Sequence, residues 1–145
     1  MLTLKQIVKS ITTQLNTKFP EINVTSRDIK EGFERPSFFV EIDNNSSSSG
    51  LFVIEKSKTI RIYYFPSDMY ENELELLQMQ DDLAEVFNLT VKIEDRTITL
   101  DETVSVVTDG VLQFEFDLNY LDSNKSTVIG GSGELMKEIE IRKVD

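Results

Sequence analysis

The chain has 145 residues, of which 39% are hydrophobic and 28% charged, a composition typical of a globular protein that buries a core. Its 26 acidic and 15 basic residues give a formal net charge of -11, which argues against binding to nucleic-acid phosphates or to an anionic membrane. The absence of Cys and His excludes disulfides, zinc sites built on these residues, and Cys–His or Ser–His nucleophilic pairs. With no signal peptide and no apolar run of about 20 residues, we expect the protein to be made and kept in the cytoplasm.

The first predicted element is a helix over residues 4–18. Apolar residues recur there every three or four positions, which is the spacing of one buried helical face. Thr3 and Gln6 have the spacing of a capping box at its start. A short strand is expected over residues 22–26.

Two strands joined by a polar loop are expected next. The stretch "SFFVEI" alternates so that Phe39 lies on the opposite face from the core residues, and residues 37–43 are predicted to form a strand. The patch "NNSSSSG", residues 44–50, is expected to be a mobile tip. A long strand over residues 51–65 follows, with Tyr63 on the same face as its neighbours two residues away.

A second helix is predicted over residues 68–87, with Ser67 as its N-cap. It is densely acidic, and two interpretations are open: a divalent-metal or acid–base site, or an ordinary solvated helix face. The solvated face is favoured, because a carboxylate metal site usually recruits ligands from several elements. Its acidic residues are Asp68, Glu71, Glu73, Glu75, Asp81, Asp82 and Glu85.

Several strands are predicted in the last part of the chain. "LTVKI" and "RTITL" form a hairpin across residues 94–95, and the "DG" at residues 109–110 is the strongest turn signal in the chain. Residues 112–120 alternate between one buried and one wet face. A second mobile loop is expected over residues 122–133, and residues 134–144 suit a final strand or a short helix leading into one.

These elements predict a single α+β domain over residues 1–145, with two main helices packed on a mostly antiparallel sheet. The sequence shows no positive sign of catalysis. "DNN" lacks the spacing of an EF-hand, and "GGSG" lacks the Lys and Ser or Thr of a phosphate-binding P-loop. We therefore expect no enzyme activity and no cofactor or metal, and the two-sided apolar strands indicate a protein that assembles with others.

The order and spacing of four segments, "EGFERPSFFVEI", "KTIRIYYFPSD", "ENELELLQMQDDLAEVF" and "VTDGVLQFEFDLNY", resemble the phage tail terminator family of contractile-tailed phages and prophage-like particles from Gram-positive hosts. The resemblance covers most of the chain. It implies a non-enzymatic α+β subunit that forms a ring, expected to be hexameric, at the head-proximal end of the tail tube. Such a ring stops polymerisation of tube and sheath and provides the surface for joining the head.

The implied partners are copies of the same chain, the tail tube protein, and the sheath and neck or connector proteins, in a virion tail assembled in the bacterial cytoplasm. Another neck or head–tail joining protein is the nearest alternative. A second alternative is an acidic inhibitor that mimics DNA. The weakest alternative is a metal-dependent hydrolase that uses the carboxylates of the second helix. Acidic residues lining the ring would repel passing DNA. The expected contacts with a neighbouring subunit or the tube involve Phe33, Arg35, Phe39, Tyr63, Ser47, Ser48 and Gly131.

Overall fold

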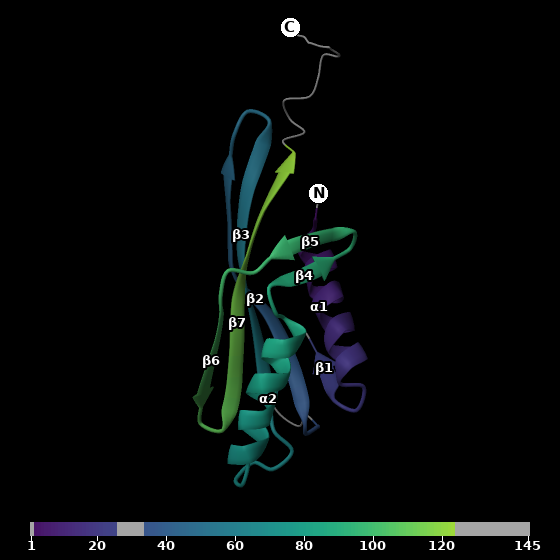
Figure 1. Ribbon diagram of the computed structural model, residues 1–145, viewed down its shortest axis with the longest axis vertical. Coiled ribbons are helices and arrows are strands. Elements are labelled where there is room, and N and C mark those ends of the chain that lie inside the picture. The colour runs from purple at the N-terminus through teal and green to yellow at the C-terminus, as the bar shows by residue number, and fades with distance from the viewer. Residues whose placement is uncertain (1, 26–33, 124–145) are drawn as a thin grey trace, which may run out of the picture. The chain divides into compact units, whose positions relative to one another are not determined.

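The computed structural model describes residues 2–25 and 34–123 (Figure 1). Two helices and seven strands follow one another along this part of the chain. In chain order they are α1 (Leu4–Lys18), β1 (Asn23–Thr25), β2 (Ser37–Ser49), β3 (Val53–Phe65), α2 (Glu73–Val86), β4 (Thr90–Ile93), β5 (Arg96–Thr99), β6 (Thr103–Thr108) and β7 (Val111–Ser123).

The strands form two sheets. The larger has five strands in the order β1-β2-β3-β7-β6, and β4 pairs with β5 in a separate two-stranded sheet. β1 runs parallel to β2, whereas β6 and β7 are antiparallel, as are β4 and β5. The predicted α+β class with a mostly antiparallel sheet is confirmed.

The chain divides into two compact units. One contains residues 46–56 and, of the described residues, 120–123; the other contains residues 2–45 and 57–119 apart from the undescribed segment 26–33. In the first unit Lys56 and Asp122 form an ion pair of 3.5 Å. The second unit contains both helices, and the expectation of a single domain remains a prediction.

The sequence placed α1 correctly. The backbone N–H of Gln6 donates to Thr3 Oγ1 at 3.1 Å, and the N–H of Thr3 donates to Gln6 Oε1 at 2.9 Å, so the predicted capping box is present. The helix buries Ile7, Ile11 and Leu15. The predicted face thus contacts the core.

The predicted start of the second helix was wrong, because α2 begins at Glu73 with Asn72 as its N-cap. The Asp68 carboxylate accepts hydrogen bonds from the backbone N–H groups of Tyr70, at 2.8 Å, and Glu71, at 3.0 Å. These bonds stabilise a turn where the sequence suggested the first helical residues. Ser67 is not the N-cap.

The predicted loops also differ from the structure. β2 continues to Ser49, so residues 44–49 belong to a strand rather than to the expected tip, and β3 begins at Val53. The chain reverses at residues 50–52, where the Gly50 N–H donates to the Val53 carbonyl at 2.7 Å. Polar residues can continue a strand when a neighbouring strand satisfies their backbone groups. Residues 122–123 likewise belong to β7; the rest of the expected loop and the tail at 134–144 lie outside the described residues.

The two predicted tight turns are confirmed. β4 and β5 pair across residues 94–95, and β6 and β7 pair across residues 109–110. Glu94 has φ 57°, and Asp109 and Gly110 have φ of 53° and 75°, the left-handed region that two-residue hairpin turns use.

The core of the second unit lies between the helices and one face of the large sheet (Figure 1). Aromatic rings meet there: Phe87 lies 5.1 Å from Phe116 and 6.1 Å from Phe114 between ring centroids. Gln14 Nε2 donates to the Lys92 carbonyl at 2.8 Å and ties the β4–β5 hairpin to α1. Other fully buried side chains of this core include Ile7, Ile11, Leu15, Phe38, Ile60, Ile62, Leu83, Ile93, Leu112 and Leu118.

Candidate interaction surface

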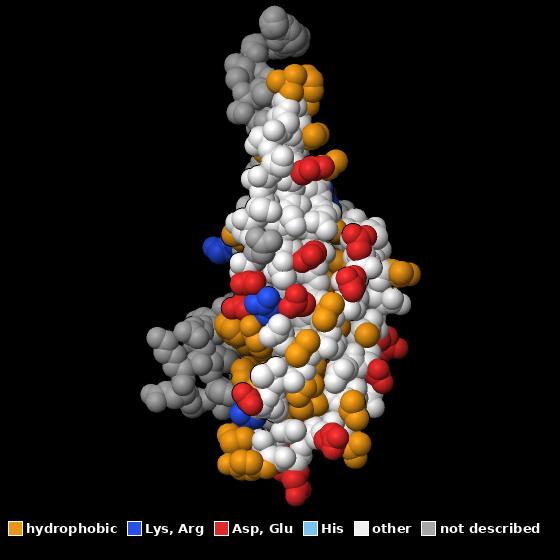
Figure 2. Space-filling model, turned by 90° about the vertical axis from the view of Figure 1, so that its left-hand side faces the viewer, with side chains coloured by type: hydrophobic (Ala, Val, Ile, Leu, Met, Phe, Trp, Pro, Cys, Tyr) orange, Lys and Arg blue, Asp and Glu red, His pale blue; other side chains and the backbone are white. Residues whose placement is uncertain are grey.

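The face of the large sheet that points away from this core, here called the outer face, carries some of the residues that the sequence singled out. Alternation along β2, β3 and β7 places every second side chain there. The β6–β7 register, which pairs Val104 with Glu115 and Val106 with Gln113, puts both valines on the same face. Figure 2 shows a face with orange and red side chains interspersed and few blue ones. The outer face comprises Phe39, Glu41, Asp43, Thr59, Arg61, Tyr63, Phe65, Val104, Val106, Gln113, Glu115 and Asp117.

Three of the predicted contact residues lie on this side of the sheet. The rings of Phe39 and Tyr63, on adjacent strands, stack with centroids 5.9 Å apart. The Tyr63 hydroxyl donates to Glu41 Oε1 at 2.9 Å. The Arg35 guanidinium lies 5.9 Å from the centre of the Phe65 ring, a cation–π distance. Phe39 and Tyr63 are both partly exposed and held in place by neighbours.

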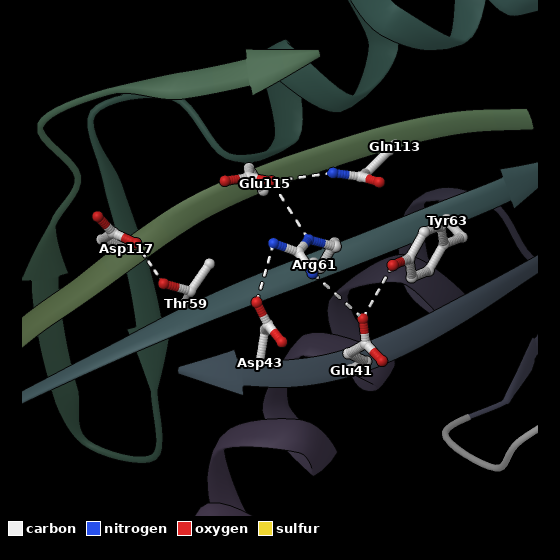
Figure 3. A network of polar contacts seen from close by, with 8 residues as sticks. All are labelled: Glu41, Asp43, Thr59, Arg61, Tyr63, Gln113, Glu115 and Asp117. Carbon is white, nitrogen blue, oxygen red and sulfur yellow. Dashed lines mark hydrogen bonds and ion pairs between the residues drawn. The ribbon is translucent and has the colours of Figure 1, made fainter. Parts of the chain in front are cut away.

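A single arginine is the centre of the polar network on this face (Figure 3). Arg61 Nη2 lies 3.0 Å from Asp43, its Nε donates to Glu115 Oε1 at 3.2 Å, and its Nη1 lies 3.6 Å from Glu41. The Arg61 side chain is 21% exposed. One guanidinium therefore links carboxylates from the two strands that flank β3.

Two further polar contacts extend this network. Gln113 Nε2 donates to Glu115 Oε1 at 3.0 Å, and the Thr59 hydroxyl donates to Asp117 Oδ1 at 2.8 Å (Figure 3). The outer face carries four carboxylates, of Glu41, Asp43, Glu115 and Asp117, and the first three contact Arg61. With Arg35 on the same side of the sheet, two negative charges remain in excess there, so this face favours a partner with positive charge.

The environment of the network favours its charged form. Burial alone would lower the pKa of Arg61, but hydrogen bonds to Tyr63 and Glu115 and the negative charges of Asp43 and Glu115 outweigh burial and raise it. Burial raises the pKa of Tyr63, and its hydrogen bond to Glu41 adds to this effect. At neutral pH Arg61 is positive and Tyr63 is a neutral donor.

The other predicted contact residues are not part of this surface. Phe33 and Gly131 lie outside the described residues. Ser47 and Ser48 are exposed on β2 in the first unit, and no contact with a partner tests their role. Their part in an interface stays a prediction.

Glu75 has the most hydrogen bonds of the carboxylates in the acidic helix. Glu75 accepts hydrogen bonds from the Tyr64 hydroxyl, the Ser67 hydroxyl at 2.7 Å and the Ser67 N–H at 2.9 Å. Burial alone would raise the pKa of Glu75, but these donors outweigh burial and lower it. Within the described ranges, no group of three or more metal-ligating side chains occurs. The carboxylate of Glu75 connects the end of β3 to α2.

Sequence reasoning missed several exposed apolar residues. Val104 and Val106 on β6 are exposed, as are Leu51 and Phe52 at the β2–β3 turn. Val104 and Val106 alternate with Thr103 and Ser105, a pattern typical of a strand with one buried apolar face, so nothing local indicated that these valines are exposed. Leu51 and Phe52 were expected to begin a strand. For Leu51 and Phe52, the available signal was the position of two large apolar residues directly after the polar patch at residues 44–50.

The fold and this surface define an α+β protein with a partly exposed sheet face that carries stacked aromatic rings and a carboxylate network. The family model of the phage tail terminator protein matches residues 6–128, and the chain belongs to that family of structural tail proteins. A search of curated proteins found no significant match. One solved structure is similar at 10% identity, covering 86% of this chain and 97% of its own, with a TM-score of 0.42. Neither described helix has the length and apolar character to cross a bilayer.

Proposed function

We propose that this protein is a tail terminator that assembles as a ring, expected to be hexameric, on the head-proximal end of a phage tail tube. The ring stops the growth of tube and sheath and provides the surface to which the head or its connector attaches. The family match over residues 6–128 is the observation that supports this function most directly. The protein needs no catalytic step for this role.

We further propose that the outer face contacts the end of the tube. It combines stacked aromatic rings, two exposed valines and an excess of negative charge, a mixture suited to specific but limited protein contact. Phe39, Tyr63 and Arg35 would supply the apolar and cation–π part of the contact. Glu41 and Asp43 would meet basic groups of the tube protein.

The test is tube growth with the purified tail tube protein from the same particle. Added terminator should yield short tubes that carry a ring at one end in electron micrographs. Val104→Glu should restore long, uncapped tubes, because a charge on an exposed outer-face valine opposes apolar contact without entering the core.

Thr97→Glu is the matched control, since Thr97 is an exposed strand residue of the other sheet. It should cap tubes as the unmodified protein does. Tubes of unlimited length in the presence of the unmodified protein would refute the terminator function. Normal tube length with failure of head attachment would point to a head–tail joining protein instead. Equal capping by Val104→Glu and Thr97→Glu would refute only the proposed role of the outer face and would leave the terminator function standing.

A further inference from the structure

A shallow groove lies between α1 and β2 in the second unit. It encloses about 560 Å³ and is lined by the apolar side chains of Leu4, Val8, Val40 and Ile42. Lys5 and Lys9, one helical turn apart, lie at the same groove. Neither lysine forms an ion pair with a described residue. In a chain of net charge -11, this α1 groove is an apolar site with unneutralised positive charge.

A second unpartnered surface lies on α2 and β6. Leu74 is 81% exposed and Leu77 is 54% exposed, and Leu77 and Val107 line one shallow hollow of about 330 Å³. Leu74, Leu77 and Val107 are called the α2 strip below. Glu73 and Asp81 lie four residues before and after Leu77, on the same side of the helix, and neither is paired with a base in the described chain.

We propose that the α2 strip of one copy docks into the α1 groove of the next copy. This inference rests on the proposed ring and names the surfaces that build it. Leu74 and Leu77 would cover the apolar floor of the groove, a helix-in-groove contact. Glu73 and Asp81 would meet Lys5 and Lys9, so apolar character and charge both match.

The same charges oppose the two symmetric alternatives. Two α2 strips facing each other would bring Glu73 and Asp81 against their own copies, and two grooves would bring Lys5 and Lys9 together. Like-charge contacts of this kind disfavour a two-fold dimer. When the α2 strip of one copy meets the α1 groove of another copy, two different surface patches are joined. Such heterologous contacts build a closed ring when the rotation from each copy to the next returns to the first.

The absence of natural cysteines allows a direct test by cross-linking. Single-cysteine variants Leu4→Cys and Leu74→Cys are mixed in equal amounts and treated with a short bis-maleimide. Leu89→Cys replaces a residue that is 72% exposed and lies outside both surfaces, and it serves as the control partner. A fourth variant, Phe52→Cys, tests whether the β2–β3 turn occupies the groove instead.

We expect the Leu4→Cys and Leu74→Cys pair to cross-link at least about fivefold faster than either variant with itself or with the Leu89→Cys control. Equal rates for all pairs would overturn the proposal. Preferential cross-linking of Leu4→Cys to Phe52→Cys would also overturn it. Faster reaction of either variant with itself would indicate a symmetric dimer.

Sedimentation of charge variants provides the second measurement. Leu4→Glu and Leu74→Glu should each weaken self-association at least about tenfold, whereas Leu89→Glu should leave it unchanged. A mixture of the first two should give dimers and nothing larger, because only one intact groove and one intact strip remain. If both variants still cap tubes and associate normally, this interface is wrong while the terminator function stands. If the Leu4→Cys and Leu74→Cys pair forms the cross-link but the unmodified protein leaves tubes uncapped, the function is wrong while the interface stands.

Discussion

Replacement of Arg61 by Met tests whether the outer-face network stabilises the fold. The substitution keeps much of the aliphatic packing and removes the charge that Glu41, Asp43 and Glu115 share. Partly exposed ion pairs contribute about 0.2–1 kcal/mol each, and contacts that share one group are not additive. We therefore expect the free energy of unfolding to fall by about 1–2 kcal/mol at low salt.

The assay is urea denaturation at two ionic strengths. At about 0.01 M salt the Debye length is about 30 Å, and at about 1 M it is about 3 Å, so the loss should shrink markedly at high salt. Lys18→Met is the control, because Lys18 forms one exposed ion pair of 3.3 Å with Glu85 and should cost less than about 0.5 kcal/mol. Equal losses for the two variants, or a loss that is independent of salt, would refute the reasoning.

Three further predictions concern the core, a turn and a partly buried polar contact. Leu83→Ala should lower the free energy of unfolding by about 2–5 kcal/mol in urea denaturation, because Leu83 is fully buried. Gly110→Ala should lower the thermal midpoint and cost about 1–2 kcal/mol, since φ is 75° there and an added Cβ would come within 3.3 Å of Asn72. Glu75→Gln should destabilise the protein at pH 7 by about 1–2 kcal/mol. Because the pKa of Glu75 is lowered by folding, its contribution is present above the unfolded pKa and is lost as the pH falls through the folded value, so chemical denaturation below about pH 4 should show a smaller difference. A difference that grows in acid would contradict this assignment.

Local signals predicted most of the elements. The capping box at Thr3, the "DG" turn at residues 109–110 and the alternation along β7 each depend on residues close together in sequence. Such features follow from backbone conformation and periodicity, which need no distant partner. The start of α2 was missed because the Asp68 carboxylate closes a turn with the same side-chain-to-backbone bonds that cap helices, and the local pattern does not show that the helix begins only at Glu73.

The sequence by itself determined the α+β class, the two helices, the tight hairpins and the resemblance to the tail terminator family, since these depend on local pattern and motif order. Only the tertiary structure decided that Arg61 meets carboxylates from two neighbouring strands, because strand order and register set which distant side chains are adjacent. It also decided that Val104 and Val106 of β6 are exposed while Leu112 and Phe114 of the paired strand β7 are buried. Exposure depends on which elements pack against each face, and no local pattern specifies this.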